Sequence, residues 1–385
     1  MPATLREGAR ALSGRPASGW MERFFQWRNG LIASPRFQDW AARTPIVRRF
    51  ARKDGEALYD LVAGFVYSQT LAASVDVGLF HALKDGPRSV QDLSAACDLS
   101  IAATKQLCQA ASSVDLLSPS GDGYRLGRLG AAVLGVPGLE DMIRHHAVFY
   151  RDLRDPVALL RGQSDPELSR FWAYVLGTDR QTVSPSVAAE YSALMASSQV
   201  LVAEETLRAF DFSKARVVMD VGGGTGAFLV ALGKAASSPD LWLYDLPNVV
   251  TDAPARFAAN GQAARSRAIG GSFRDEDLPQ GADLITLVRV CYDHNDDTVQ
   301  ALLRAVYAAL PRGGTLVISE PMSGGKHPSR AGDAYFAFYT RAMTTGRPRA
   351  FDDFAALLSE AGFSQVHSHP TGRPFITSVI SARKL

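Results

Sequence analysis

The chain has 385 residues, of which 46% are hydrophobic and 21% are charged, and its formal net charge is +2. This composition indicates a globular protein of about two domains, and so small a net charge argues against bulk nucleic-acid binding. The three cysteines, Cys97, Cys108 and Cys291, are odd in number and lack metal-ligand spacing, so we expect a reducing cytosol and no metal site. No apolar run reaches the ~18 residues of a membrane span, and we expect no signal peptide.

Residues 1–55 differ in composition from the rest and are predicted to form an N-terminal extension. They contain eleven Arg and Lys against four Asp and Glu, and three of the five tryptophans. Trp20, Phe24, Trp27 and Leu31 recur at helical spacing, which predicts a basic, aromatic amphipathic helix. Such a helix suits the surface of an anionic membrane. Packing of this face on the body of the protein or on a partner subunit is the alternative.

Residues 56–180 are predicted to form a second, mostly helical domain. Helical segments over 58–83, 89–99 and 100–117 precede a glycine-punctuated stretch, 118–134, which predicts a small β-wing. This order is typical of a winged helix, a module that can bind DNA. The helix that would enter the groove carries only Lys105 as a base, so packing or dimerisation is favoured. Residues 139–180 are expected to continue as helix.

Residues 181–385 are predicted to form an α/β domain. A long helix over 184–210 leads into a strand and a glycine loop, and strands over 282–290 and 314–320 flank a helix over 296–310. A late helix, 351–363, is followed by two extended runs that suggest a hairpin. Strands that alternate with helices predict a parallel sheet with right-handed crossovers.

The stretch RVVMDVGGGTGAF, residues 216–228, reads as a buried strand, a glycine turn and the start of a helix. Gly222, Gly224 and Gly226 allow backbone angles closed to other residues and let a ligand approach the main chain. The next strand ends at Asp245, whose carboxylate is suited to accept both hydroxyls of a ribose. This arrangement predicts a nucleotide-like ligand.

The glycine pattern alone does not identify that ligand, because Gly222, Gly224 and Ala227 also match the dinucleotide motif. Asp220, at the end of the strand, would repel a pyrophosphate and attract an ammonium or sulfonium group. S-adenosylmethionine carries both cations and no phosphate, so it is the favoured cofactor. A nicotinamide oxidoreductase and a glycine turn without a ligand are the alternatives.

Further motifs extend this pattern along the chain: LYDLPNVV, GGSF at 270–273, RVCYDHNDD at 289–297 and PRGGTLVISEPM. With the glycine stretch, their order and spacing over residues 56–385 resemble the class I S-adenosylmethionine-dependent O-methyltransferases of the plant caffeate type. The resemblance implies a helical, winged-helix-like dimerisation domain, a seven-stranded Rossmann-like sheet and a homodimer. It also implies a set of cofactor-binding residues: Asp220, Gly222, Gly224, Asp245, Leu246, Ser272, Phe273 and Arg289.

The segments 20–52 and 58–69 are similar to one branch, the bacterial acyclic-carotenoid O-methyltransferases of the hydroxyneurosporene or demethylspheroidene type. This similarity implies methylation of the tertiary hydroxyl of an acyclic hydroxycarotenoid, in the cytoplasm or at the surface of a photosynthetic membrane. A small-phenol O-methyltransferase and a bacteriochlorophyllide C-methyltransferase are alternatives within the family. A non-catalytic, winged-helix ligand-sensing regulator is the alternative of another class.

Two departures from the caffeate pattern bear on the chemistry. Tyr292 stands where the family has a catalytic His, and only the first of two flanking glutamates is present, as Glu320, because the second falls near Pro348. Ser272 replaces an Asp that contacts adenosine in the family. The acceptor-side candidates are therefore Tyr292, Glu320 and the next histidine, His294. Residues that we expect to line an apolar acceptor pocket are Phe149, Tyr191, Met195, Phe336, Phe338, Tyr339 and Met343.

Overall fold

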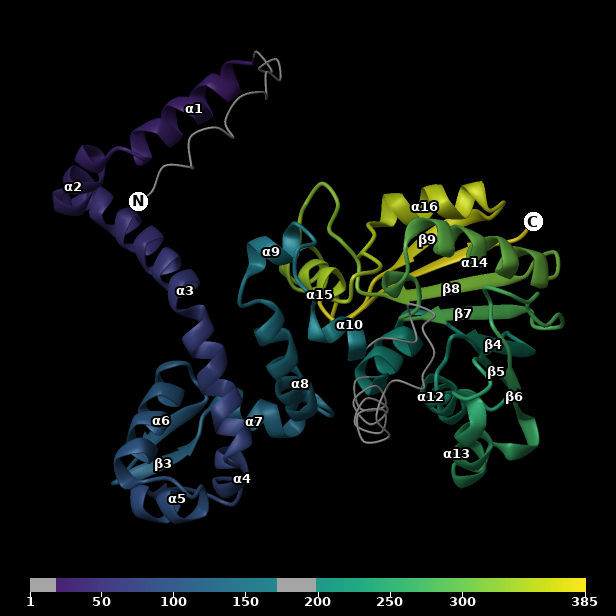
Figure 1. The fold of residues 1–385 in the computed structure, drawn as a ribbon, viewed down its shortest axis with the longest axis horizontal. Coiled ribbons are helices and arrows are strands. Elements are labelled where there is room, and N and C mark those ends of the chain that lie inside the picture. Colours follow the sequence, from purple (N-terminus) through teal and green to yellow (C-terminus); the bar gives the residue numbers. More distant parts are fainter. Residues whose placement is uncertain (1–18, 172–198) are drawn as a thin grey trace. The chain divides into compact units, whose positions relative to one another are not determined.

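The computed structural model of the chain describes residues 19–171 and 199–385, which belong to two compact units, residues 1–70 and 71–385 (Figure 1). The predicted boundary at residue 55 lies inside a helix, α3 (Pro45–Asp76), and the predicted boundary at residue 180 lies outside the described residues. The three-part domain division therefore stays a prediction, and the two units are described separately below.

The described part of the first unit is helical. It contains α1 (Trp20–Ile32), α2 (Pro35–Arg43) and most of α3, and the predicted N-terminal amphipathic helix is present as α1. No residue of α1 is buried, and the indole of Trp20 is 79% exposed. The exposed apolar side chains continue along α3: Ile46, Phe50, Leu58, Tyr59, Leu61, Val62, Phe65 and Val66.

The second unit begins with the predicted winged-helix arrangement. Its helices are α4 (Leu79–Ala82), α5 (Val90–Ala96), α6 (Ile101–Ser113) and α7 (Arg128–Gly135). The hydroxyls of Ser89 and Ser100 cap α5 and α6 by accepting backbone N–H groups at 3.2 Å. The wing is the antiparallel pair β2 (Leu117–Ser120) and β3 (Gly123–Leu126), and β1 (Arg88–Ser89) adds to β3. The prediction of a β-wing over 118–134 is confirmed for this pair.

The predicted continuous helix over 139–180 is wrong for its described part. The structure has three shorter helices, α8 (Leu139–Asp152), α9 (Pro156–Leu160) and α10 (Glu167–Phe171). Pro156 disfavours helical backbone at the residue before it, and the Asp155 side chain caps α9 by accepting the N–H of Ala158 at 2.9 Å. Of the predicted helix over 184–210, residues 199–209 are helical, and residues 184–198 lie outside the described part.

The rest of the second unit contains a seven-stranded sheet in the order β6-β5-β4-β7-β8-β10-β9, as predicted from the family resemblance. The first five strands are parallel: β6 (Ser266–Gly270), β5 (Asp240–Asp245), β4 (Val217–Val221), β7 (Leu284–Val288) and β8 (Thr315–Glu320). The predicted C-terminal hairpin, β9 (Ser364–His369) and β10 (Ser378–Arg383), adds antiparallel to β8.

Helices cover both faces of this sheet (Figure 1). On one face α12 (Ala227–Ala235) and α13 (Ala253–Ala259) pack against Val218 and Leu243, and on the other α14 (Asp296–Ala309) and α16 (Phe351–Glu360) pack against Met219 and Leu287. Successive strand residues thus enter opposite cores, which explains their continuous apolar runs. The remaining elements are short helices: η2 (Val250–Asp252), η3 (Ala263–Arg265), η4 (Cys291–Asp293), the π-helix η5 (Arg330–Phe336) and α15 (Ala337–Ala342). Among the described residues, no helix is long and apolar enough to span a membrane.

Candidate active site

The glycine loop follows β4 and leads into α12, at the carboxyl edge of the parallel strands. Gly222, Gly224 and Gly226 have φ angles of 71°, 62° and 79°, which confirms that this turn requires left-handed backbone. A Cβ atom added at Gly222 would lie 2.8 Å from the side chain of Val290, whereas one added at Gly224 would meet no atom within 4 Å. The main chain at Gly224 is therefore accessible, as a ligand-binding loop requires.

Asp245, the last residue of β5, lies beside this loop because β4 and β5 are adjacent parallel strands. Its carboxylate accepts the N–H of Gly224 at 2.7 Å and the N–H of Leu246 at 2.6 Å. A carboxylate has about four lone-pair positions, so it can accept more hydrogen bonds than these two. The structure thus brings together three predicted cofactor-binding residues and fixes the orientation of the carboxylate.

Asp220 lies beneath the loop rather than on its outer surface. Its side chain is fully buried, and Oδ1 accepts the hydroxyl of Thr286 at 2.6 Å. Oδ2 would lie 2.3 Å from a Cβ atom added at Gly223, so the carboxylate packs directly against the loop main chain. Burial raises the pKa of Asp220 to about 7, the Thr286 hydrogen bond opposes this rise, and the charge of Asp245 adds to it. Any effect of this acid on a bound cation is therefore exerted through the loop.

Ser272 and Phe273 follow β6, the strand on the far side of β5. The Ser272 hydroxyl donates to Asp275 at 2.7 Å and accepts the N–H of Arg274 at 3.3 Å. It therefore stabilises its own turn. The ring of Phe273 packs edge-to-face against His294, with 5.5 Å between the ring centroids.

A tight turn after β7 carries the acceptor-side candidates. It starts at Arg289, a non-glycine residue with a φ of 57°, and this departure from extended backbone ends the strand before the predicted residue 290. Glu320, the last residue of β8, lies under the turn. Its Oε1 accepts the N–H groups of Val290 and Cys291 at 2.8 and 2.7 Å, and Oε2 accepts that of Tyr292 at 3.4 Å. Both carboxylate oxygens thus serve the main chain of the turn.

Burial raises the pKa of Glu320 to about 7, while the three backbone hydrogen bonds and the charge of Arg289 oppose the rise. Tyr292 is 1% exposed, and its hydroxyl accepts a hydrogen bond from Nη2 of Arg289 at 3.1 Å. The next residue, Asp293, is also buried. Burial, and then the charge of Glu320, raises the pKa of its carboxyl well above the ordinary value, while Arg289 and a hydrogen bond with Tyr292 lower it.

His294 contacts the segment that follows β6, through Phe273 and Arg274. Its Nδ1 lies 3.1 Å from Nη2 of Arg274, which donates to it. Burial lowers the pKa of His294 to about 3, and the charges of Arg274 and Arg349 lower it further. This imidazole is therefore neutral near pH 7 and forms part of the packing around Phe273.

The described residues of the predicted acceptor pocket lie in one aromatic cluster. The ring centroids of Phe149 and Tyr339 are 5.3 Å apart, and those of Tyr292 and Phe336 are 6.0 Å apart. Met343 is fully buried and packs in the same cluster, against which Phe338 is partly buried. The other two predicted pocket residues, Tyr191 and Met195, lie outside the described residues.

Sequence reasoning missed two histidines in this cluster. Nε2 of His145 lies 2.7 Å from the hydroxyl of Tyr339, and Nε2 of His146 lies 2.8 Å from that of Tyr335. Burial lowers the pKa of His145 to about 4, with a smaller contribution from His146. A histidine pair between apolar residues of a predicted helix was the available signal.

Sequence reasoning also missed Arg349. Its guanidinium is buried against the turn that carries Tyr292, on the side opposite Glu320. It donates hydrogen bonds to the main-chain oxygens of Cys291 and His294 and to Asp296. From the sequence, only the neighbouring Pro348 was considered, because the family has a glutamate near that position.

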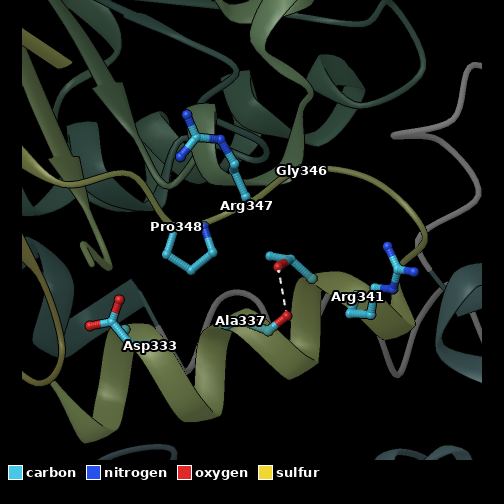
Figure 2. A pocket seen from close by; sticks show the side chains of 8 residues that line it. Asp333, Ala337, Arg341, Gly346, Arg347 and Pro348 are labelled. Carbon is cyan, nitrogen blue, oxygen red and sulfur yellow. Dashed lines mark hydrogen bonds between the residues drawn. The ribbon is translucent and has the colours of Figure 1, made fainter. Parts of the chain in front are cut away.

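A hollow of about 370 Å³ lies between α15 and the segment around Gly346 (Figure 2). Asp333, Arg341 and Arg347 give it a polar lining, and no residue of the glycine loop contributes to it. It is therefore not the predicted cofactor site. Among the described residues, no group of three or more His, Cys, Asp or Glu side chains is placed to hold a metal ion.

The sequence profile of the O-methyltransferase domain matches residues 150–364, more than half of the chain. The chain belongs to this family. This protein is therefore an S-adenosylmethionine-dependent O-methyltransferase. The match confirms the family that was predicted from the glycine loop and the later motifs. A second profile, of the O-methyltransferase dimerisation domain, matches residues 59–135 and supports a homodimer.

Relatives and solved structures agree with this assignment. The demethylspheroidene O-methyltransferase of Cereibacter sphaeroides is 50% identical over 353 residues, which cover 91% of this chain and 93% of the relative. That of Rhodobacter capsulatus is 48% identical over 354 residues, covering 92% and 88%. The mitomycin 7-O-methyltransferase structure matches with a TM-score of 0.73 at 22% identity, over 88% of this chain and 100% of that one. The human N-acetylserotonin methyltransferase, solved with S-adenosylmethionine, has a TM-score of 0.68 at 24% identity, over 86% and 97%. These two structures show the shared fold.

The residues present fit this cofactor. The accessible main chain at Gly224 and the fixed carboxylate of Asp245 suit the two hydroxyls of a ribose. The buried acid Asp220 lies directly under the loop and favours a cation above it over a phosphate.

Proposed function

We propose that the O-methyltransferase methylates the tertiary hydroxyl of an acyclic hydroxycarotenoid of the hydroxyneurosporene or demethylspheroidene type, in carotenoid biosynthesis. The observation that carries this proposal is the 50% identity to a demethylspheroidene O-methyltransferase along 91% of the chain. Tyr292, at the position of the family's catalytic histidine, supports an acceptor that is not a phenol.

S-adenosylmethionine supplies an electrophilic methyl group on a positively charged sulfur. Asp245 holds the ribose hydroxyls, with the N–H groups of Gly224 and Leu246 fixing its carboxylate. Gly222 gives the turn its shape, and Asp220 stabilises positive charge from beneath it. The other members of the proposed cofactor-binding set are Ser272, Phe273 and Arg289.

On the acceptor side, Tyr292 holds the hydroxyl. A phenol has a pKa near 10, as in Tyr, and a histidine can remove its proton, but a tertiary alcohol is far less acidic. Its proton therefore leaves together with methyl transfer, and the oxygen of Tyr292 is the proposed late acceptor of that proton. Catalysis then depends mainly on alignment in a dry pocket, and alignment reaches effective molarities on the order of 10⁵–10⁸ M. Both carboxylate oxygens of Glu320 accept backbone N–H groups, so its proposed role is to stabilise the conformation of the turn. His294 is the reserve candidate for a base.

The hydrocarbon part of the acceptor needs an apolar, aromatic wall. The cluster of Phe149, Tyr339 and Met343 is buried, and Phe336 connects it to Tyr292. Tyr191 and Met195, which lie outside the described residues, stay candidates for this wall from the sequence alone.

The test is incubation of the purified enzyme with labelled S-adenosylmethionine and a panel of acceptors. The panel contains an acyclic hydroxycarotenoid, a catechol and a bacteriochlorophyllide, each presented in the same detergent. We expect label in the carotenoid as an ether. Much faster labelling of the catechol or the bacteriochlorophyllide would show that the acceptor assignment is wrong.

We also propose that residues 1–55 dock the enzyme on an anionic membrane surface, where a carotenoid is dissolved, so that it is a peripheral protein on the cytoplasmic side. Trp20, Phe24 and Trp27 are 79%, 47% and 63% exposed on α1, and Arg23 and Arg28 are next to Phe24 and Trp27 in the sequence. Exposed aromatic rings beside arginines suit the boundary between lipid headgroups and acyl chains.

Sedimentation with phosphatidylglycerol vesicles at low salt tests this docking. Arg23→Gln/Arg28→Gln should reduce the bound fraction and leave S-adenosylmethionine affinity unchanged. The matched control removes two exposed arginines of the wing region, Arg125→Gln/Arg128→Gln, and should bind like the parent. A full-length protein that ignores these vesicles, or two variants that lose binding equally, would contradict the proposal.

A further inference from the structure

The turn that carries Tyr292 is held from two opposite sides. On the N–H side, the carboxylate of Glu320 accepts the backbone groups of residues 290–292. On the C=O side, Arg349 donates to the turn from a segment more than fifty residues further along the chain. Both partners are buried, Glu320 at 0% and Arg349 at 1% exposure.

Arg349 makes its contacts with the geometry of a clamp. Nη1 donates to the main-chain oxygen of Cys291 at 2.7 Å, and Nη2 donates to that of His294 at 2.8 Å. Nε donates to Oδ1 of Asp296 at 2.9 Å, which keeps the charge paired at the first residue of α14. These two carbonyl groups belong to the residue before Tyr292 and to the residue after Asp293. Their positions therefore determine the direction in which the Tyr292 side chain leaves the backbone.

The segment of Arg349 contacts the turn at a second point. Gly346 has a φ of 76°, and a Cβ atom added there would lie 2.1 Å from the main-chain oxygen of Tyr292 and 2.5 Å from the carbonyl carbon of Asp293. Residues 346–349 are therefore packed against the turn without space for a side chain at Gly346. Pro348 stiffens the connection between the two contacts.

The turn requires this support because its backbone is strained. Arg289, at its start, has a left-handed φ of 57° without being glycine. Backbone strain of this kind persists only where the surrounding structure fixes it, and it is concentrated at functional sites. A planar guanidinium donates from three nitrogens in a fixed fork, whereas the three N–H groups of a lysine ammonium share one nitrogen and cannot reach all three acceptors.

We propose that Arg349 is a positioning residue for Tyr292: by holding the oxygens of Cys291 and His294, it fixes the Tyr292 hydroxyl at the acceptor. Arg349 does not itself meet the acceptor. The inference rests on the role proposed for Tyr292 above.

The test compares Arg349→Lys with a matched control, Arg347→Lys. Arg347 lies two residues away, shares the partner Asp296 at 3.2 Å and also pairs with Asp353, but its side chain is 47% exposed. We expect Arg349→Lys to lower kcat by ~10²-fold, the cost of a misplaced reacting group, with unchanged calorimetric affinity for S-adenosylmethionine and a folded protein by circular dichroism. Arg347→Lys should keep the parent's kcat. If Arg349→Lys does not fold, Asp296→Asn, which retains an accepting oxygen for Nε, should give a smaller loss of kcat.

A double-mutant cycle with Tyr292→Phe decides whether Arg349 acts through Tyr292. We expect the double variant to be no slower than the slower single variant, because both changes remove the same alignment. Three outcomes would overturn the inference while leaving the proposed function intact. The first is that the two changes lower kcat independently in the double variant. The others are equal losses of kcat in the Arg347 and Arg349 variants, and a loss of S-adenosylmethionine affinity that parallels the loss of kcat. A Tyr292→Phe enzyme with the parent's kcat would overturn the role of Tyr292 itself, and the inference with it.

Discussion

Replacement of Asp245 by alanine is the most direct test of the cofactor site. The carboxylate is held by the N–H groups of Gly224 and Leu246 at 2.7 and 2.6 Å, so its direction is set before the cofactor binds. Asp245→Ala removes the acceptor for the ribose hydroxyls and also leaves two backbone N–H groups without this partner. Both effects weaken binding of S-adenosylmethionine.

The expected size follows from hydrogen bonds to a charged group. Loss of such bonds costs ~1–3 kcal/mol, which corresponds to a rise in Kd of roughly 5- to 150-fold. Asp245→Asn keeps one accepting oxygen but places an NH₂ group against a backbone N–H group. We therefore expect its Kd to lie between those of the parent and the alanine variant, or close to the latter.

Titration calorimetry of the purified variants gives these values directly. Asp240→Ala is the matched control, because Asp240 is an exposed acid at the opposite end of the same strand, β5. It should bind S-adenosylmethionine like the parent. An Asp245→Ala protein that folds and binds the cofactor with the parent's Kd would refute the assignment, as would tight binding of NAD by the parent.

Three further predictions follow from the site and the fold. Tyr292→Phe should reduce turnover of the hydroxycarotenoid by ~10²–10⁴-fold at most, whereas Tyr292→His should not improve it but should add activity on a catechol, since an imidazole suits a phenol; equal catechol rates in parent and histidine variant would contradict this. The pKa of His145 is lowered from 6.5 to about 4, so the folded state favours the neutral imidazole. The contribution of His145 to the free energy of unfolding is therefore complete above pH 6.5 and is lost as the pH falls through about 4. His145→Gln should flatten that part of the pH dependence of the unfolding free energy, measured with urea, and an unchanged slope would count against it. Light scattering should give twice the chain mass of 41.4 kDa at micromolar concentration, and Leu61→Asp, on the exposed face of α3, should shift it toward the monomer; a monomeric parent would reject the dimer.

Much of the sheet could be predicted from sequence because its strands are buried on both faces and its helices are strongly periodic. The predicted helix over 296–310 is observed as Asp296–Ala309, and the strand over 314–320 as Thr315–Glu320. The prediction failed where backbone geometry depends on distant contacts. The strand after 282 ends early because Arg289 takes a left-handed φ, and the π-helix over Arg330–Phe336 has no simple periodic signature.

The site was predictable where chemistry and topology coincide. Asp245 could be placed beside the glycine loop because consecutive parallel strands end at one edge of the sheet. Glu320 could be placed near the turn, but its orientation toward backbone N–H groups could not, since residue type does not determine which partner a carboxylate meets. Arg349 and His145 were missed because their partners are 58 and 194 residues away in the sequence, and no local pattern marks such contacts.

The acceptor chemistry and the architecture of the turn point to the same physical requirement. An alcohol oxygen becomes strongly acidic as it gains the methyl group, so its proton can leave to a weak base while the methyl group is being transferred. An ionising base is then unnecessary, and the rate depends on how closely oxygen, methyl and sulfur are aligned. Glu320 and Arg349 hold the two sides of the turn through main-chain groups, so they contribute geometry rather than basicity. A tyrosine in place of the histidine is thus consistent with a site in which orientation has replaced proton abstraction as the main source of catalysis.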